Sequence, residues 1–315
     1  MIRNPKHRVR PKRKHLHWVP EFYLRYFATP ETRSAKRPQV WIFSKDASDQ
    51  DESLTWIRNV CGKRYLYAPL EPDGSRDWSL EDQLEKIEAT LGRIWKELAE
   101  GFAQLDDVVI RNGVALFVAV MHLRNPETRK MVEAIHQQLV AFFAGMPRWP
   151  DGTPRLDSFE MWGRTFPVDA QGWREFHSWG KNEHDKLFVD IVRSEAISIA
   201  EMLMKKRWSV VFAETDTFVT SDRPVAIQHL SRETAGFGTP DGIVSFPLGP
   251  RRLLVMDDMH HEPENQYYPL QQTNAGAFNL GIWRNGSRFM ITGRPVPDVL
   301  TEICDCAEAY EGGSA

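Results

Sequence analysis

Three separate segments of the chain carry side chains that could do chemistry, and the first is an aromatic segment near the start. His17 is the only side chain in it that titrates near neutral pH. It could act as a general base, or as a metal ligand together with Glu88 and Asp222. Tyr23 could donate a hydrogen bond to a phosphate or an oxyanion. Alternatively, a histidine beside Trp18 could be a core residue whose hydrogen bonds are satisfied.

The second segment is centred on Asp222, which follows an apolar strand pattern and precedes Pro224. A carboxylate at the end of a strand is a frequent metal ligand or general base. Asp and Ser side chains also close turns by accepting backbone N–H groups, and Ser221 stands next to Asp222. Both interpretations, catalyst and turn, are open at this point.

The third segment contains His122, Arg124 and Asn125, which lie at the end of a predicted apolar helix. A buried Arg requires a paired carboxylate. The candidate partners are Glu85, Glu88 and Asp222. A His–Arg–carboxylate cluster could form the floor of a pocket, with Arg124 holding a phosphate and His122 contacting the substrate. The alternative is a structural ion pair that anchors two long helices.

Acidic residues in these segments suggest a divalent metal, Mg²⁺ or Mn²⁺, with Glu88 and Asp222 as ligands. Several familiar motifs are absent from the sequence. It has no phosphate-binding loop of the P-loop type, no dinucleotide fingerprint, no nucleophile elbow and no His-Glu-x-x-His. These absences argue against a P-loop NTPase, a Rossmann dehydrogenase, an α/β-hydrolase and a zincin protease.

Residues 1–14 hold seven basic residues and no acidic one, whereas the rest of the chain holds 33 basic and 43 acidic residues. A basic arm on an acidic body is typical of a nucleic-acid contact, and we expect Arg10, Lys12 and Arg13 to take part in it. The alternative is a flexible arm that only aids solubility. The chain has three Cys residues, no signal-peptide pattern and no apolar run of about 18 residues, so we expect a cytoplasmic protein without a membrane partner.

The hydrophobic pattern predicts the elements that position these residues. Apolar residues at helical spacing predict long helices over 79–103, 108–123, 126–144 and 182–205. Period-two patterns follow, including strands over 208–213 and 217–220 joined by a turn. We therefore expect an α+β fold in which an antiparallel sheet packs on a long helical hairpin. The predicted domain covers 15–311, and 312–315 form a flexible tail.

Residues 145–180 interrupt the helical pattern with many Pro, Gly and Trp residues. We interpret this segment as an insertion or lid, with one short helix around residues 159–162. It could bind a protein partner.

The quoted motifs also carry a family resemblance. The pattern His17-x-x-Pro-x-x-Tyr-Leu-x-x-Phe27, followed far downstream by Thr220-Ser221-Asp222-x-Pro224, resembles the bacterial family DUF4238, a domain of unknown function. A Glu-rich helix and the turn at Arg124-Asn125-Pro126 fit the same pattern. The resemblance runs from about residue 15 to about residue 291, and residues 145–180 are its least similar part. It implies an architecture and no activity.

From these features we expect a metal-assisted phosphodiester hydrolase that acts on RNA or DNA, with His17, Glu88, Arg124 and Asp222 as catalytic residues. The bacterial resemblance and the basic arm extend this expectation to a toxin or defence effector. The alternative is a non-enzymatic binding or scaffold protein whose polar cluster is structural.

Overall fold

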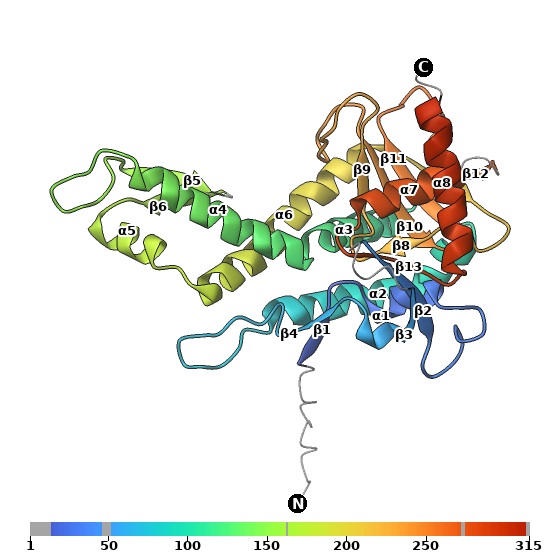
Figure 1. Ribbon diagram of the computed structural model, residues 1–315, viewed down its shortest axis with the longest axis horizontal. Helices are drawn as coiled ribbons and strands as arrows, with labels where there is room; N and C mark the ends of the chain where they lie inside the picture. Colours follow the sequence, from blue (N-terminus) through green and yellow to red (C-terminus); the bar gives the residue numbers. More distant parts are fainter. Residues whose placement is uncertain (1–13, 46–51, 162, 272–274, 313–315) are drawn as a thin grey trace, which may run out of the picture.

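The computed structural model describes residues 14–45, 52–161, 163–271 and 275–312. It shows two main sheets and two separate strand pairs, β1-β4 and β5-β6, beside a set of helices (Figure 1). The larger sheet has the strand order β12-β7-β11-β10-β9, and only β12 runs parallel to its neighbour, β7. Its strands are β7 (Arg207–Phe212), β9 (Ala226–Gln228), β10 (Ile243–Gly249), β11 (Arg252–Asp257) and β12 (Gln266–Pro269). The expected α+β class is confirmed.

The smaller sheet is antiparallel and has the order β3-β2-β13-β8. Its strands are β2 (Gln39–Ser44), β3 (Ser53–Trp56), β8 (Thr220–Ser221) and β13 (Phe289–Thr292). Strands β7 and β8 were expected to be joined by a simple turn, but they belong to different sheets. The segment between them carries the chain from one sheet to the other.

Helices cover the sheets and form the middle of the chain. They are α1 (Glu21–Leu24), α2 (Ser79–Glu100), α3 (Val108–Leu123), α4 (Pro126–Ala144), α5 (Ala170–His177), α6 (Lys181–Lys205), α7 (Ala275–Asn285) and α8 (Val296–Gly312). Short 3-10 turns follow α1 (η1, Arg25–Phe27) and β3 (η2, Ile57–Asn59). Asp107 begins α3 by accepting the N–H groups of Val109 and Ile110, as a residue of this type is expected to do.

Helices α4 and α6 extend side by side away from the two sheets and form an arm (Figure 1). At the far end of the arm, β5 (Ser158–Met161) pairs with β6 (Arg164–Pro167), and α5 follows. The short helix expected around residues 159–162 is wrong, because residues 158–161 are strand. Gly163 has a positive φ of 69°, a conformation that suits the tight turn between two paired strands.

The aromatic segment near the start is docked in the core. Tyr23 is fully buried against a cluster of rings from other elements, with Phe246 stacked on it at a centroid distance of 5.5 Å. Trp95 lies edge-on to Phe117 at 4.9 Å, and its indole N–H donates to the carbonyl of Leu248 at 2.9 Å. These contacts fix α1 between α2, α3 and the larger sheet.

Within the described residues, no single helix has the length and apolar character to cross a membrane. Helices α3 and α4 meet that criterion only when taken together across a 54° bend, and only by length and composition.

Candidate functional site

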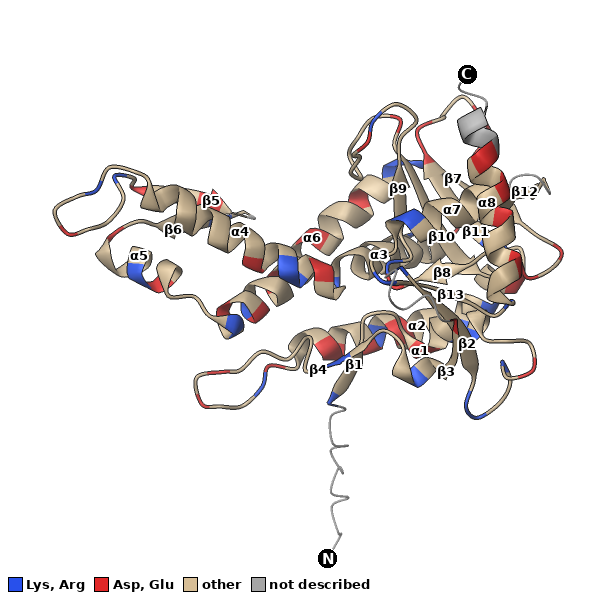
Figure 2. Cartoon of the chain, viewed as in Figure 1, with Lys and Arg blue, Asp and Glu red and all other residues tan. Residues whose placement is uncertain are grey.

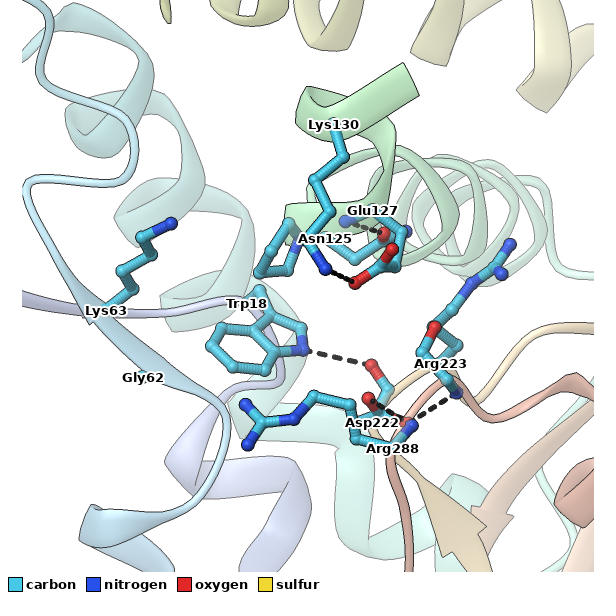
Figure 3. Close-up of a pocket in the computed structure, with 11 residues that line it drawn as sticks. Trp18, Gly62, Lys63, Asn125, Glu127, Lys130, Asp222, Arg223 and Arg288 are labelled. Atoms are coloured by element: carbon cyan, nitrogen blue, oxygen red, sulfur yellow. Dashed lines mark hydrogen bonds and ion pairs between the residues drawn. The ribbon is translucent and has the colours of Figure 1, made fainter. Parts of the chain in front are cut away.

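A hollow of about 310 Å³ lies where the motif segments meet, and we call it the phosphate-type pocket because of the cations described below (Figure 3). It is bounded by the residue after β1 (His15–His17), by β4 (Gly62–Arg64), by the start of α4, and by the loops before α4, after β8 and before β13. The lining residues are Trp18, Gly62, Lys63, Asn125, Pro126, Glu127, Lys130, Asp222, Arg223, Ser287 and Arg288. Each of the three segments singled out in the sequence therefore contributes lining residues to this pocket.

Trp18 connects two of these segments through its main chain and its indole. Its backbone N–H donates to the carbonyl of Cys61 at 2.8 Å, next to β4. Its indole N–H donates to the main-chain carbonyl of Asp222 at 2.9 Å. Its own carbonyl accepts from Nε of Arg124 at 2.8 Å. The wall of the pocket is thus fixed by hydrogen bonds in which Trp18 is the common member.

Arg124 is fully buried and finds the carboxylate that its burial requires. Its Nη1 donates to Oε1 of Glu88 at 2.7 Å, which joins the end of α3 to α2. Burial alone would lower the pKa of Arg124, but Glu88, Tyr67 and Glu81 together outweigh that effect and raise the pKa. The hydroxyl of Tyr67 also donates to the Arg124 carbonyl at 2.6 Å. This arrangement is the structural ion pair between long helices that was one interpretation of the sequence.

Asp222 uses its carboxylate to hold the loop between α7 and β13. Oδ1 accepts from the backbone N–H of Ser287 at 2.9 Å, and Oδ2 accepts from that of Arg288 at 3.1 Å. Burial raises the pKa of Asp222, and the hydrogen bonds from these two amides oppose that effect. Ser221 closes the local turn, since its Oγ accepts from the N–H of Arg223 at 3.1 Å. Asp222 therefore fixes a loop that is distant in sequence, and it also lines the pocket.

Four basic side chains line the pocket, and they outnumber its two carboxylates (Figure 3). One carboxylate, Glu127, pairs with Lys130 at 2.8 Å. Among the described residues, Lys63, Arg223 and Arg288 have no carboxylate within 4.0 Å with which to form an ion pair.

Further cations lie close to the pocket. Burial and the neighbouring charges of Arg129 and Lys181 lower the pKa of Lys63, although Arg129 and Lys181 both form ion pairs with Asp185. Figure 2 shows basic and acidic segments next to each other on α4 and α6 in the arm. The described lining of the pocket thus has more basic than acidic side chains.

His17 and Glu88 line a different and smaller hollow of about 200 Å³, together with Glu81 and Glu85 of α2. His17 Nε2 lies 3.0 Å from the carbonyl of Arg58, and Nδ1 lies 3.6 Å from a carboxylate oxygen of Glu21. Burial lowers the pKa of His17 in spite of these acceptors. The structure thus brings His17 and Glu88 to one hollow and Asp222 to another.

Tyr23 and His122 do not line either hollow. The hydroxyl of Tyr23 donates to the carbonyl of Pro247 at 2.8 Å and lies 2.9 Å from Oγ1 of Thr220, and burial raises its pKa. The ring of His122 packs edge-on against Phe237 at 4.7 Å. Tyr23 is therefore a core residue, and His122 is partly buried. The basic residues Arg10, Lys12 and Arg13 lie outside the described residues.

The described residues do not fit a metal ion held by the protein. No group of three or more His, Cys, Asp or Glu side chains among them could hold one. The expected pair, Glu88 and Asp222, lies in two different hollows, and each carboxylate is already bonded, to Arg124 and to backbone amides.

Sequence reasoning missed the cations of the pocket. Arg223 stands inside the motif at residues 220–224, so its position could have drawn attention to it. Lys63 and Arg288 have no such local signal, because only the tertiary fold brings them beside Asp222.

The family model described as "Protein of unknown function (DUF4238)" matches residues 14–295. No curated protein matches the chain, and no solved structure does. The match covers nearly the whole chain and includes every described residue that lines the phosphate-type pocket.

Proposed function

We propose that this chain, which belongs to the DUF4238 family, binds a phosphate group of a nucleotide or nucleic acid in the phosphate-type pocket. The observation that carries the proposal is the gathering of four basic side chains at the meeting point of the three motif segments, with three of them free of ion pairs among the described residues. A cluster of like charges is costly unless an anion neutralises it. A phosphate provides that charge together with several acceptor oxygens.

The parts of the pocket have distinct roles in this proposal. Arg223 and Arg288 present guanidinium groups, which match phosphate oxygens in pairs, whereas Lys63 acts as a mobile point charge. The N-terminal end of α4 adds partial positive charge, since the dipole of a 19-residue helix points its positive end at the pocket. Asp222 and Trp18 hold the loops that carry these groups.

The test is a binding titration with a labelled single-stranded RNA. We expect Arg288→Gln and Lys63→Gln each to weaken binding by about tenfold, the usual order for losing a charged hydrogen-bond donor. Arg93→Gln is the control, because Arg93 is an exposed cation on α2 outside the pocket. Equal affinity of all three variants and the wild type would refute the proposal.

A second candidate is phosphodiester hydrolysis at the same pocket, and one observation favours it. Asp222 lines the pocket, and its raised pKa brings it closer to the range in which a carboxyl group transfers protons. We expect Asp222→Asn to abolish cleavage while it keeps the fold, because an amide oxygen can still accept from Ser287 and Arg288. The measurement is the cleavage of labelled RNA, single-stranded DNA and duplex DNA.

That cleavage assay is run with Mg²⁺, with Mn²⁺ and with a chelator, so it also tests the expected divalent metal. Absence of cleavage under every condition would leave phosphate binding as the function. A protein partner at residues 145–180, a cytoplasmic location and a bacterial toxin or defence role stay predictions. The last of these is checked by growth arrest on expression, which His17→Ala should relieve.

A further inference from the structure

A third hollow, of about 290 Å³, lies beside β3 and α1 and combines an exposed aromatic ring with several cations and one carboxylate, that of Glu21. Trp56 ends β3, the edge strand of the smaller sheet, and 39% of its surface is exposed. Lys36, Arg37 and Arg58 are exposed and line the same hollow. We call it the Trp56 pocket. It shares no lining residue with the phosphate-type pocket.

Hydrogen bonds to backbone carbonyls fix the segments that form the walls of the Trp56 pocket. Nη1 of Arg25 donates to the carbonyls of Arg33 and Ala35, each at 3.2 Å, and so fixes the loop that carries Lys36 and Arg37. The N–H of Ile57 donates to the carbonyl of Pro38 at 3.1 Å, which ties that loop to η2. The pocket therefore has a defined shape, although its basic side chains reach solvent.

The chemistry of the Trp56 pocket suits a flat ring that is joined to a negatively charged group. The guanidinium of Arg37 lies 4.5 Å from the centre of the Trp56 ring, in a cation–π contact. Among the described residues, neither Lys36, Arg37 nor Arg58 forms an ion pair with a carboxylate. Nucleobases stack on exposed aromatic rings and on guanidinium planes, and the adjoining phosphates are held by Lys and Arg.

We propose that the Trp56 pocket binds one nucleotide unit of a single-stranded nucleic acid. The base stacks against Trp56 and Arg37, and Lys36 and Arg58 hold the flanking phosphates. A duplex does not fit this arrangement, because its bases are paired and stacked on each other. The proposal goes beyond the phosphate-type pocket and rests on different residues, so either proposal can fail alone.

The arm provides a matched control for this proposal. Trp149 is 45% exposed, and the guanidinium of Arg155 lies 5.0 Å from the centre of its ring. This pair repeats the Trp56–Arg37 contact in a different part of the molecule. A variant of Trp149 therefore reports what the loss of any exposed Trp–Arg pair does to the protein.

The experiment measures binding of a labelled oligothymidylate of about ten nucleotides, a length within the range of single-strand sites. A strand of the same length without bases serves as the second probe. We expect Trp56→Ala to weaken binding of the oligothymidylate by about tenfold, and Trp56→Phe to retain most of it. Neither variant should change binding of the baseless strand, and Trp149→Ala should change neither probe.

Three results would overturn the proposal. One is wild-type affinity of Trp56→Ala for the oligothymidylate. Another is an equal loss for the two probes, which would show that only charge is recognised. The third is an equal loss in Trp149→Ala. Arg37→Gln and Arg58→Gln provide a second test in case Trp56→Ala does not fold, because both residues are exposed. Each of these two variants should weaken binding of the oligothymidylate.

Discussion

Arg124 shows how much a single residue can reveal before the fold is known. Its place at the end of an apolar helix predicts burial, and burial requires a carboxylate partner, which the structure provides in Glu88. The same reasoning does not extend to Lys63 or Arg288. Lys63 and Arg288 reach the pocket only through the tertiary fold, and no local sequence pattern predicts that they line it.

The ion pair between α2 and α3 gives the first prediction. Glu88→Gln should lower the free energy of unfolding by about 2 kcal/mol, because it leaves a buried guanidinium without a counter-charge. The value lies below that for a fully buried pair, since the Glu88 side chain is 29% exposed. Chemical denaturation measures it. Glu85→Gln, an exposed neighbour on the same helix, should change the free energy by less than about 0.5 kcal/mol.

The pH dependence of stability tests the burial of His122. Burial and the nearby Arg223 lower its pKa from 6.5 to about 4. The unfolded chain therefore binds a proton at higher pH than the folded protein does. The contribution of neutral His122 to the free energy of unfolding is complete above about pH 6.5. It falls by up to about 3 kcal/mol as the pH drops towards 4.

The measurement for His122 is the free energy of unfolding of the wild type and of His122→Phe between these two pH values. The variant should show a shallower loss with acid, because its ring packs against Phe237 without titrating. Parallel curves for the two proteins would contradict the assignment.

At the scale of elements, the arm shows where sequence patterns succeed and where they fail. The helices α4 and α6 follow from their apolar spacing, and Asn125 with Pro126 marks the start of α4. The hairpin of β5 and β6 was missed because the Pro and Gly content of residues 145–180 dominated the interpretation. The alternating pattern of Phe159 and Met161 before Gly163 was the available signal.

A pair of histidines joins α4 to α6 inside the arm. Nε2 of His136 donates to the carbonyl of Phe176 at 2.8 Å, so in the neutral ring Nδ1 accepts from Nε2 of His184 at 3.1 Å. Burial and the neighbouring His136 lower the pKa of His184. A positive charge on the buried His184 ring is unfavourable, so protonation of His184 in acid destabilises the contact between α4 and α6.

We therefore expect the far end of the arm to open in acid. The charges near the pair are Glu133 and Arg129 on α4 and Glu183 on α6. Hydrogen exchange of α5, corrected for the intrinsic effect of pH, should lose protection as the pH falls below about 6.5, whereas α2 should keep it. His184→Phe should remove this difference between α5 and α2. Unchanged protection of α5 down to about pH 5 would show that protonation of His184 does not destabilise this end of the arm.

At the scale of the whole molecule, the α+β class could be predicted from the order of the patterns, since a helical middle precedes a run of strands. The strand order could not, because β8 and β13 are far apart in sequence and meet beside β2. The pocket depends on the pairing of β8 with β13. It places the Asp222 turn against the loop before β13, and Trp18 joins that turn to Arg124 at the end of α3.

The central claim is that the phosphate-type pocket binds an anion, and the most direct measurement is the position of one. Crystals soaked in tungstate, a heavy tetrahedral mimic of phosphate, would reveal it by anomalous scattering. We expect the strongest peak within hydrogen-bond distance of Lys63, Arg223 or Arg288. A map whose peaks lie only elsewhere on the molecule, or which has none, would contradict the account.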